Sequence, residues 1–184
     1  MTQQSRMSWK IKDEAVLAEL ITLMQISDQE RALLAALHPL AVSGSAAMAK
    51  DFYKRLVAHQ ETHEYLKDAS LDGLHMTTAK WFEDLFCGTY DEEYARKRLR
   101  IGIVHVKIGL PVRYPIAMLD VIINHGEIIA QKSPHPEQAL AAFRKLIALD
   151  LAIFNQAYED NQLLHLAELV GGERLARLLL TGQE

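Results

Sequence analysis

The sequence has few of the residues that mark secreted, membrane-spanning or chelating proteins. Its 184 residues include one cysteine, Cys87, which excludes an internal disulfide framework and fits a reducing compartment. No apolar run approaches the roughly 20 residues that a membrane-spanning helix needs, and residues 1–9 lack the apolar core of a signal peptide. We therefore predict a cytoplasmic protein without a membrane span.

Motifs of several enzyme and binding classes are also missing. The chain contains no glycine-rich phosphate loop, no nucleophile elbow and no Cys-x-x-Cys pair. Its His-x-x-x-His spacing, His59 and His63, lies in polar sequence where both side chains are expected to be solvated, so neither a catalytic centre nor a zinc site is predicted. A net charge of −4 argues against a nucleic-acid partner, because such proteins usually present a basic surface.

The apolar residues that are present recur at helical spacing, and no stretch alternates as a strand does. With 49% hydrophobic residues, the chain is long enough for one domain with a single core. Ser27 and Glu30 form a capping box, and Pro39 followed by Ser43–Ser45 is expected to divide the helix that begins there. The fold class is all-α, with helices predicted over residues 11–24, 28–38, 46–59, 71–86, 91–110, 112–131, 137–170 and 173–180.

The two late helices, 112–131 and 137–170, are apolar around much of their circumference. Such a helix is either central in its own core or shared with a partner. We predict a homodimer in which these helices form a four-helix bundle across a two-fold axis. The alternative is that their apolar stripes only close the core of the monomer. These helices carry more apolar residues than one core-facing side of a domain this size needs to bury: Ile122, Ile123, Ile129, Leu146, Leu149, Ile153 and Leu164.

One histidine, His105, lies within an apolar helical stripe that ends at Gly109-Leu110-Pro111. Its ring has two nitrogens to satisfy among aliphatic neighbours. A backbone hydrogen bond with a buried water would satisfy them, and so would a metal ion on one nitrogen. Considered alone, the residue is compatible with both interpretations.

The residues around His105 form a longer pattern: Tyr90-Asp91-Glu92-Glu93-Tyr94, then Arg98-Leu99-Arg100-Ile101-Gly102, then Val104-His105-Val106-Lys107-Ile108-Gly109-Leu110-Pro111. This pattern resembles the proximal-histidine segment of the globin-coupled sensor family, and the resemblance extends more weakly over residues 10–165. It implies a globin fold with an extra N-terminal helix, haem b as the cofactor and His105 as the axial ligand of its iron. It also implies a sensor of dioxygen, or of carbon monoxide or nitric oxide.

The same resemblance implies the domain organisation. Residues 1–10 would be a flexible lead-in, residues 11–170 the sensor globin domain, and residues 171–184 the start of a linker. The linker would lead to a C-terminal output domain that lies outside this chain, such as a diguanylate cyclase or a histidine kinase. The chain itself is expected to be a sensor and not an enzyme.

The other predicted pocket residues come from spacing and from the resemblance. Tyr53, a phenol in an apolar stripe, is the expected hydrogen-bond donor to the gas. The resemblance assigns Leu74 and Thr77 to the same distal wall, and His75, rotated about 100° from Leu74 on the helix, is not predicted as a ligand. The remaining pocket residues are Phe52, Trp81, Ile101, Val104, Ile108 and Met118.

Two alternatives remain open. In the first, the chain is a cofactor-free all-α dimerisation module in which His105 and Tyr53 are structural. In the second, it uses the haem for catalysis, although no distal acid–base pair supports this. One position departs from the family: Pro115 stands where a second aromatic residue usually follows Tyr114. Proline suits the first turn of a helix, so this departure puts a signalling role in question but not the fold.

Overall fold

The computed structural model describes residues 14–67 and 69–182, and these residues form helices without a strand. The predicted all-α class is confirmed. The predicted lead-in 1–10 and the first residues of the helix predicted from residue 11 lie outside the described part. The helices are α1 (Glu14–Met24), α2 (Asp28–Ala58), α3 (Gln60–His63), the 3₁₀ turn η2 (Glu64–Leu66), α4 (Leu71–Asp84), α5 (Glu92–Lys107), α6 (Arg113–Ala130), α7 (Pro136–Val170) and α8 (Glu173–Leu180).

The helix α2 differs from the prediction because it runs unbroken through Pro39 and Gly44. Its start is as expected: the Ser27 amide donates to Glu30 Oε2 at 2.8 Å, and the Glu30 amide donates to Ser27 Oγ at 3.2 Å. A proline inside a helix costs about 3 kcal/mol, and tertiary contacts offset this cost. Residues on both sides of Pro39 are buried in the core, and the Ser45 hydroxyl donates to Glu83 of α4 at 2.8 Å.

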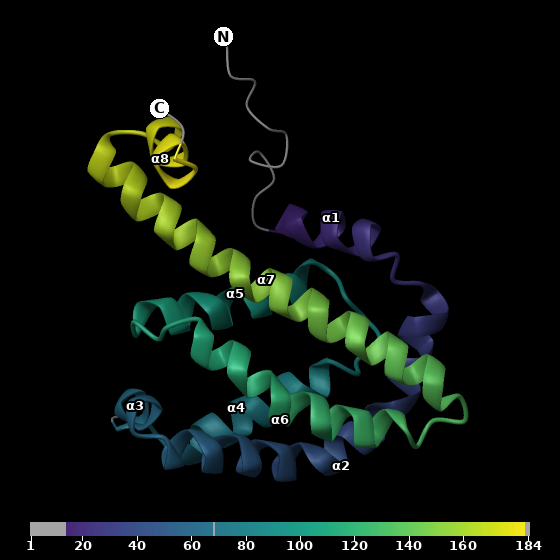
Figure 1. The fold of residues 1–184 in the computed structure, drawn as a ribbon. Helices are drawn as coiled ribbons and strands as arrows, with labels where there is room; N and C mark the ends of the chain where they lie inside the picture. The colour runs from purple at the N-terminus through teal and green to yellow at the C-terminus, as the bar shows by residue number, and fades with distance from the viewer. Residues whose placement is uncertain (1–13, 68, 183–184) are drawn as a thin grey trace.

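The core lies where α7 crosses the other long helices (Figure 1). In this view α7 runs diagonally across the molecule, α6 lies between α7 and α2, and α4 and α5 lie behind. Helix α4 packs on α2, and α5 packs on α7. The fully buried side chains at these contacts include Leu34, Met48, Phe82, Phe86, Phe143 and Leu146.

Two glycines allow helices to approach closely. A Cβ on Gly126 of α6 would lie 1.9 Å from Phe143 Cζ of α7. A Cβ on Gly102 of α5 would lie 2.5 Å from Ala157 Cβ and 2.9 Å from the Phe154 carbonyl oxygen. Both contacts fix a neighbouring helix against α7, and Gly102 does so one turn before His105.

The burial of α6 and α7 within the monomer removes most of the exposed apolar surface on which the predicted dimer was based. Most of the apolar residues that motivated it lie in the core of the monomer, because α6 and α7 pack against α2 as well as against each other. Ile122, Ile129, Leu146, Leu149 and Ile153 are all buried. Of the residues cited for the dimer only Leu164 is largely exposed, at 57%. The monomer core therefore accounts for most of this apolar surface.

One of the described helices, α2, is long and apolar enough to cross a membrane by length and composition alone. Its inward residues Leu34, Ala41 and Met48 have no exposed surface and belong to the core. Core helices commonly meet the same criterion, so the feature is weak evidence for a span.

Candidate functional site

His105 lies at the C-terminal end of α5, in a turn whose geometry follows from local sequence. Gly109 has φ 71°, its amide bonds the Val106 carbonyl at 2.9 Å, and the Leu110 amide bonds the His105 carbonyl at 3.0 Å. This pair of bonds is the Schellman motif, which favours glycine because an L side chain is strained at positive φ. The motif and the following Pro111 end α5 one turn beyond His105, as predicted.

The His105 ring is held so that one nitrogen remains available. Its Nδ1 is 2.7 Å from the Ile101 carbonyl oxygen, four residues earlier on the helix. A carbonyl only accepts, so Nδ1 carries the proton and Nε2 keeps its lone pair. No hydrogen bond or ion pair involving Nε2 is found within residues 14–67 and 69–182. The ring is also fixed by an edge contact with Phe154, with the ring centroids 5.4 Å apart.

The surroundings of His105 are apolar and favour its neutral form. Burial lowers the pKa of His105 below its ordinary value, and the bond to the Ile101 carbonyl opposes this shift only in part. On the same face of α5, Val104 is 56% exposed and Ile108 is 51% exposed. A neutral imidazole with a free nitrogen, flanked by uncovered aliphatic side chains, is suited to bind the metal of a large apolar cofactor.

A second cluster joins α2 and α4 around Tyr53. The Tyr53 hydroxyl lies 3.0 Å from Thr78 Oγ1, and the Tyr53 ring lies 4.9 Å from the His75 ring, centroid to centroid. Tyr53 is buried, and burial raises its pKa above the ordinary value, although the bond to Thr78 opposes the shift. The phenol therefore stays protonated and keeps its hydrogen-bond donor at neutral pH.

The contacts of Tyr53 show which side chains of α4 meet it. Thr77, which is predicted for the distal wall, is exposed, and its hydroxyl bonds the Leu74 carbonyl of its own helix at 3.0 Å. Leu74, predicted for the same wall, is half-buried, and His75 and Thr78 face Tyr53. Successive residues of a helix point about 100° apart, so the face of α4 that meets Tyr53 is one residue round from the face that carries Leu74 and Thr77.

Trp81, expected in the pocket, belongs to a buried polar network that sequence reasoning missed. Asp150 of α7 accepts from Trp81 Nε1 at 2.9 Å, from the Tyr94 hydroxyl at 2.6 Å and from Arg98 Nε at 2.5 Å. Arg98 lies in a stretch rich in basic residues, which is typical of a solvated helix face, yet it is only 2% exposed. It also donates to the Trp81 carbonyl at 3.0 Å and lies 3.7 Å from Asp84.

This network fixes the position of α5 relative to α4 and α7. Burial alone would lower the pKa of Arg98, but the Asp150 carboxylate beside it raises the pKa above its usual value. The guanidinium also lies over the Tyr94 ring, 4.3 Å from its centroid. Arg98 is two helical turns before His105 on α5, so the ion pair anchors the helix that carries the candidate ligand.

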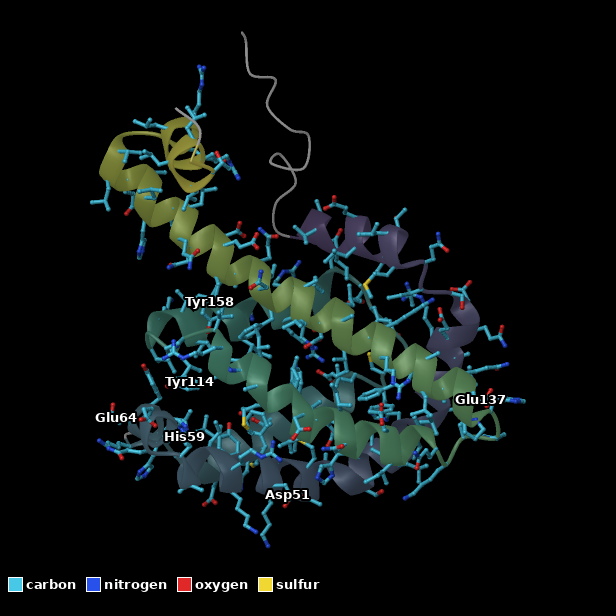
Figure 2. All side chains as sticks on the ribbon, viewed as in Figure 1. Asp51, His59, Glu64, Tyr114, Glu137 and Tyr158 are labelled. Atoms are coloured by element: carbon cyan, nitrogen blue, oxygen red, sulfur yellow. The ribbon has the colours of Figure 1, made fainter. Side chains whose placement is uncertain are left out.

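A cavity of about 410 Å³ lies between the C-terminal end of α2 and the N-terminal part of α6. Its apolar lining includes Met118, which was predicted to face a pocket and is buried. His59 and Tyr114, which Figure 2 shows near each other at this end of the molecule, have ring centroids 6.0 Å apart. The lining residues are Arg55, Leu56, His59, Thr62, Arg113, Tyr114, Ala117 and Met118.

Two other predicted pocket residues have clear positions. Phe52 is half-buried against the core and meets the Tyr53 ring edge-on, with centroids 5.3 Å apart. Ile101 is half-buried and supplies the carbonyl that orients His105. Among the described residues, no group of three or more His, Cys, Asp or Glu side chains could hold a metal ion. A metal at His105 would therefore come with a cofactor that supplies its other ligands.

The core is all-helical. Helix α5, which carries His105, packs on α7, while Tyr53 and its partner Thr78 come from α2 and α4. This arrangement is typical of a globin. A family model described as Protoglobin matches residues 13–163. The chain belongs to this family, and its resemblance to globin-coupled sensors is confirmed.

Two relatives give the extent of the similarity. The heme-based aerotactic transducer HemAT of Halobacterium salinarum is 30% identical in an alignment of 161 positions, which covers 82% of this chain and 32% of the transducer. The chain thus spans about a third of that curated relative. The globin domain of a Geobacter sulfurreducens globin-coupled sensor is 32% identical with a TM-score of 0.71, covering 77% of this chain and 96% of that domain.

Proposed function

We propose that this chain is a haem-based gas-sensing domain in which His105 Nε2 is the protein ligand of the haem iron. The observation that carries the proposal is the bond from Nδ1 to the Ile101 carbonyl. This bond fixes the tautomer that leaves Nε2 free, and the exposed Val104 and Ile108 beside it offer the apolar contact that a porphyrin ring needs. The match to the protoglobin family and the name of the aerotactic transducer support this proposal.

The haem would be haem b, held without a covalent bond. The single cysteine, Cys87, cannot form the Cys-x-x-Cys-His motif that attaches haem covalently. The cavity at the start of α6 would accommodate part of the ring, since Leu56, Ala117 and Met118 give it apolar walls. On its rim, Arg113 stacks on Tyr114 and makes no ion pair within the described residues. Arg113 is thus the available cation for a haem propionate.

When bound, haem iron would supply reversible binding of a diatomic gas. Tyr53 is the proposed hydrogen-bond donor to that gas. Its hydroxyl is protonated and buried, and Thr78, 3.0 Å away, can accept or donate to hold it in place. A gas that acquires negative charge on binding would be stabilised by this donor, which favours dioxygen over carbon monoxide as the signal.

The remaining parts of the proposal concern the longer protein. We infer that the domain passes its signal through α7 and α8 to a C-terminal output domain, such as a diguanylate cyclase or a histidine kinase, in a cytoplasmic protein. A homodimer through α6 and α7 is supported by the apolar side chains that stay exposed there. These are Ile116 at 40%, Ile128 at 55%, Leu164 at 57% and Leu169 at 84%. The domain itself is proposed to sense and not to catalyse.

The test is the absorption spectrum of protein expressed with ample haem supply. The wild type should carry a haem band that His105→Ala loses and that added imidazole restores. The exposed His135 serves as a matched control, and His135→Ala should keep the wild-type spectrum. A colourless wild type, or a His105→Ala protein with an unchanged spectrum, would contradict the proposal and favour the cofactor-free module.

The donor role of Tyr53 has a separate measurement. Tyr53→Phe removes only the hydroxyl, so dioxygen should dissociate roughly tenfold faster, the factor expected for losing one hydrogen bond worth about 1.4 kcal/mol. Stopped-flow release of dioxygen measures this rate directly. The dissociation of carbon monoxide, which carries little charge, should change much less. Equal changes for both gases would exclude Tyr53 as a specific donor.

A further inference from the structure

One turn of α7, from Phe154 to Tyr158, contacts both His105 and the turn that follows it. The Phe154 ring meets the His105 ring edge-on, with an interplanar angle of 77°. The Tyr158 hydroxyl donates to the Leu110 carbonyl at 3.0 Å, and Figure 2 shows Tyr158 on α7 beside the turn that leads from α5 into α6. Residues four apart lie on the same face of a helix, so one face of α7 holds the His105 ring and the backbone beyond it.

The Tyr158 bond reaches the backbone of His105 through a single residue. The Leu110 amide donates to the His105 carbonyl at 3.0 Å, while the Leu110 carbonyl accepts from Tyr158. Both backbone polar groups of Leu110 are thus used, one toward α5 and one toward α7. Tyr158 is half-buried, so water would replace a broken bond only in part. A movement of His105 along α5 would therefore displace the acceptor of the Tyr158 hydroxyl.

The approach of α5 to α7 restricts the His105 ring in a second way. With no side chain at Gly102, the α5 backbone lies against Ala157 and the Phe154 carbonyl oxygen. His105 is less than one turn beyond Gly102, so the Phe154 ring limits how far the imidazole can rotate. The bond from Nδ1 to the Ile101 carbonyl selects the tautomer of His105, and the contacts from α7 restrict the plane of its ring.

We propose that Phe154 and Tyr158 are positioning residues, which set the orientation of His105 toward the haem iron and join it to α7. This inference rests on the proposed haem function. Phe154 would act on the imidazole ring and Tyr158 on the backbone that carries it, so both act through His105. Helix α7 continues for about three turns beyond Tyr158 to Val170. A change in the position of His105 would therefore reach the end of α7 that leads into α8.

The experiment compares wild type with Phe154→Leu and Tyr158→Phe, all loaded with haem. Tyr90→Phe is the matched control, because the Tyr90 hydroxyl also donates to a backbone carbonyl, at 2.9 Å. Tyr90 precedes the first turn of α5, which lies roughly 20 Å of helix away from His105. Resonance Raman spectra of reduced, gas-free protein report the iron–histidine stretching band. Hydrogen exchange reports the stability of the turn after α5.

We expect the iron–histidine band to shift or broaden in both α7 variants and to keep its wild-type position in Tyr90→Phe. The Leu110 amide should exchange roughly two- to tenfold faster in Tyr158→Phe, the range expected for losing one hydrogen bond, and at the wild-type rate in Tyr90→Phe. Equal haem content and circular dichroism show that the variants are folded.

The outcomes separate this inference from the proposed function. If the α7 variants lose as much stability as Tyr90→Phe but keep the wild-type band, their contacts are only structural and the inference is overturned, while His105-dependent haem binding stands. A band that moves equally in Tyr90→Phe would also overturn it, because the shift would not depend on contact with His105. A chain that binds no haem would overturn both.

Discussion

Replacing Asp150 by asparagine should destabilise the protein far more than the loss of a surface ion pair. Asp150 is 5% exposed, and its two oxygens accept from three donors: the Trp81 indole, the Tyr94 hydroxyl and Arg98 Nε. Asparagine has the same size but one oxygen and one amide group. Its amide would face at least one donor, and the buried Arg98 would lose its nearer counter-charge and keep only Asp84, 3.7 Å away.

The expected cost follows from breaking a buried pair on one side. Breaking a buried ion pair by removing one partner typically costs about 3–5 kcal/mol, and the lower end applies here because Asp84 remains near Arg98. With an unfolding entropy of about 2.1 cal/mol/K per residue, a chain of this length loses about 8–13 °C of Tm. The assay is thermal and urea unfolding followed by helical circular dichroism, with wild type and variant in the same haem-loaded state.

The chain contains a matched control for this experiment. Arg55 and Asp120 also form an Arg–Asp contact of 2.5 Å, but their side chains are 53% and 60% exposed, against 2% and 7% for Arg98 and Asp150. Asp120→Asn should cost less than about 1 kcal/mol, because water screens and solvates an exposed pair. If the two variants lost similar stability, burial would not be the source of the effect and the reasoning would fail.

Three further predictions use other contacts. Gly102→Ala should destabilise the protein by about 1–3 kcal/mol through overpacking and should weaken haem retention. The control Gly44→Ala, whose Cβ would meet only an ordinary contact at 3.7 Å, should be neutral or slightly stabilising in the same unfolding assays. Arg113→Gln should speed haem transfer to an acceptor globin, while Arg144→Gln, which changes an exposed arginine paired with Glu127 outside the cavity, should not. Equal rates would exclude Arg113 as the propionate partner. The contribution of Tyr94 to stability should be fully present below about pH 10, the ordinary tyrosine value, and should be lost as pH rises further, because burial raises the pKa of Tyr94 in the folded state. Tyr94→Phe should therefore reduce the fall of the unfolding free energy above pH 10 in urea titrations, and an unchanged slope would contradict this.

The sequence by itself determined what depends on neighbours within about a turn of helix. The capping box at Ser27 and the helix end at Gly109-Leu110-Pro111 were both readable as local patterns. His105 belongs to this class, because its orienting carbonyl is four residues earlier on the same helix. The all-α class and the family resemblance also followed from periodicity and from this contiguous motif.

Tertiary structure alone decided what depends on partners far apart in the chain. Arg98 has the composition of a solvated helix face, and only Asp150, 52 residues later, makes its burial favourable. Thr77 and Thr78 are indistinguishable by type, and the packing of α4 on α2 selects Thr78 to meet Tyr53 and brings His75 beside it. Pro39 signals a break, yet core contacts on both sides keep α2 continuous. In each case the deciding free energy comes from burial against another helix, which no local pattern contains.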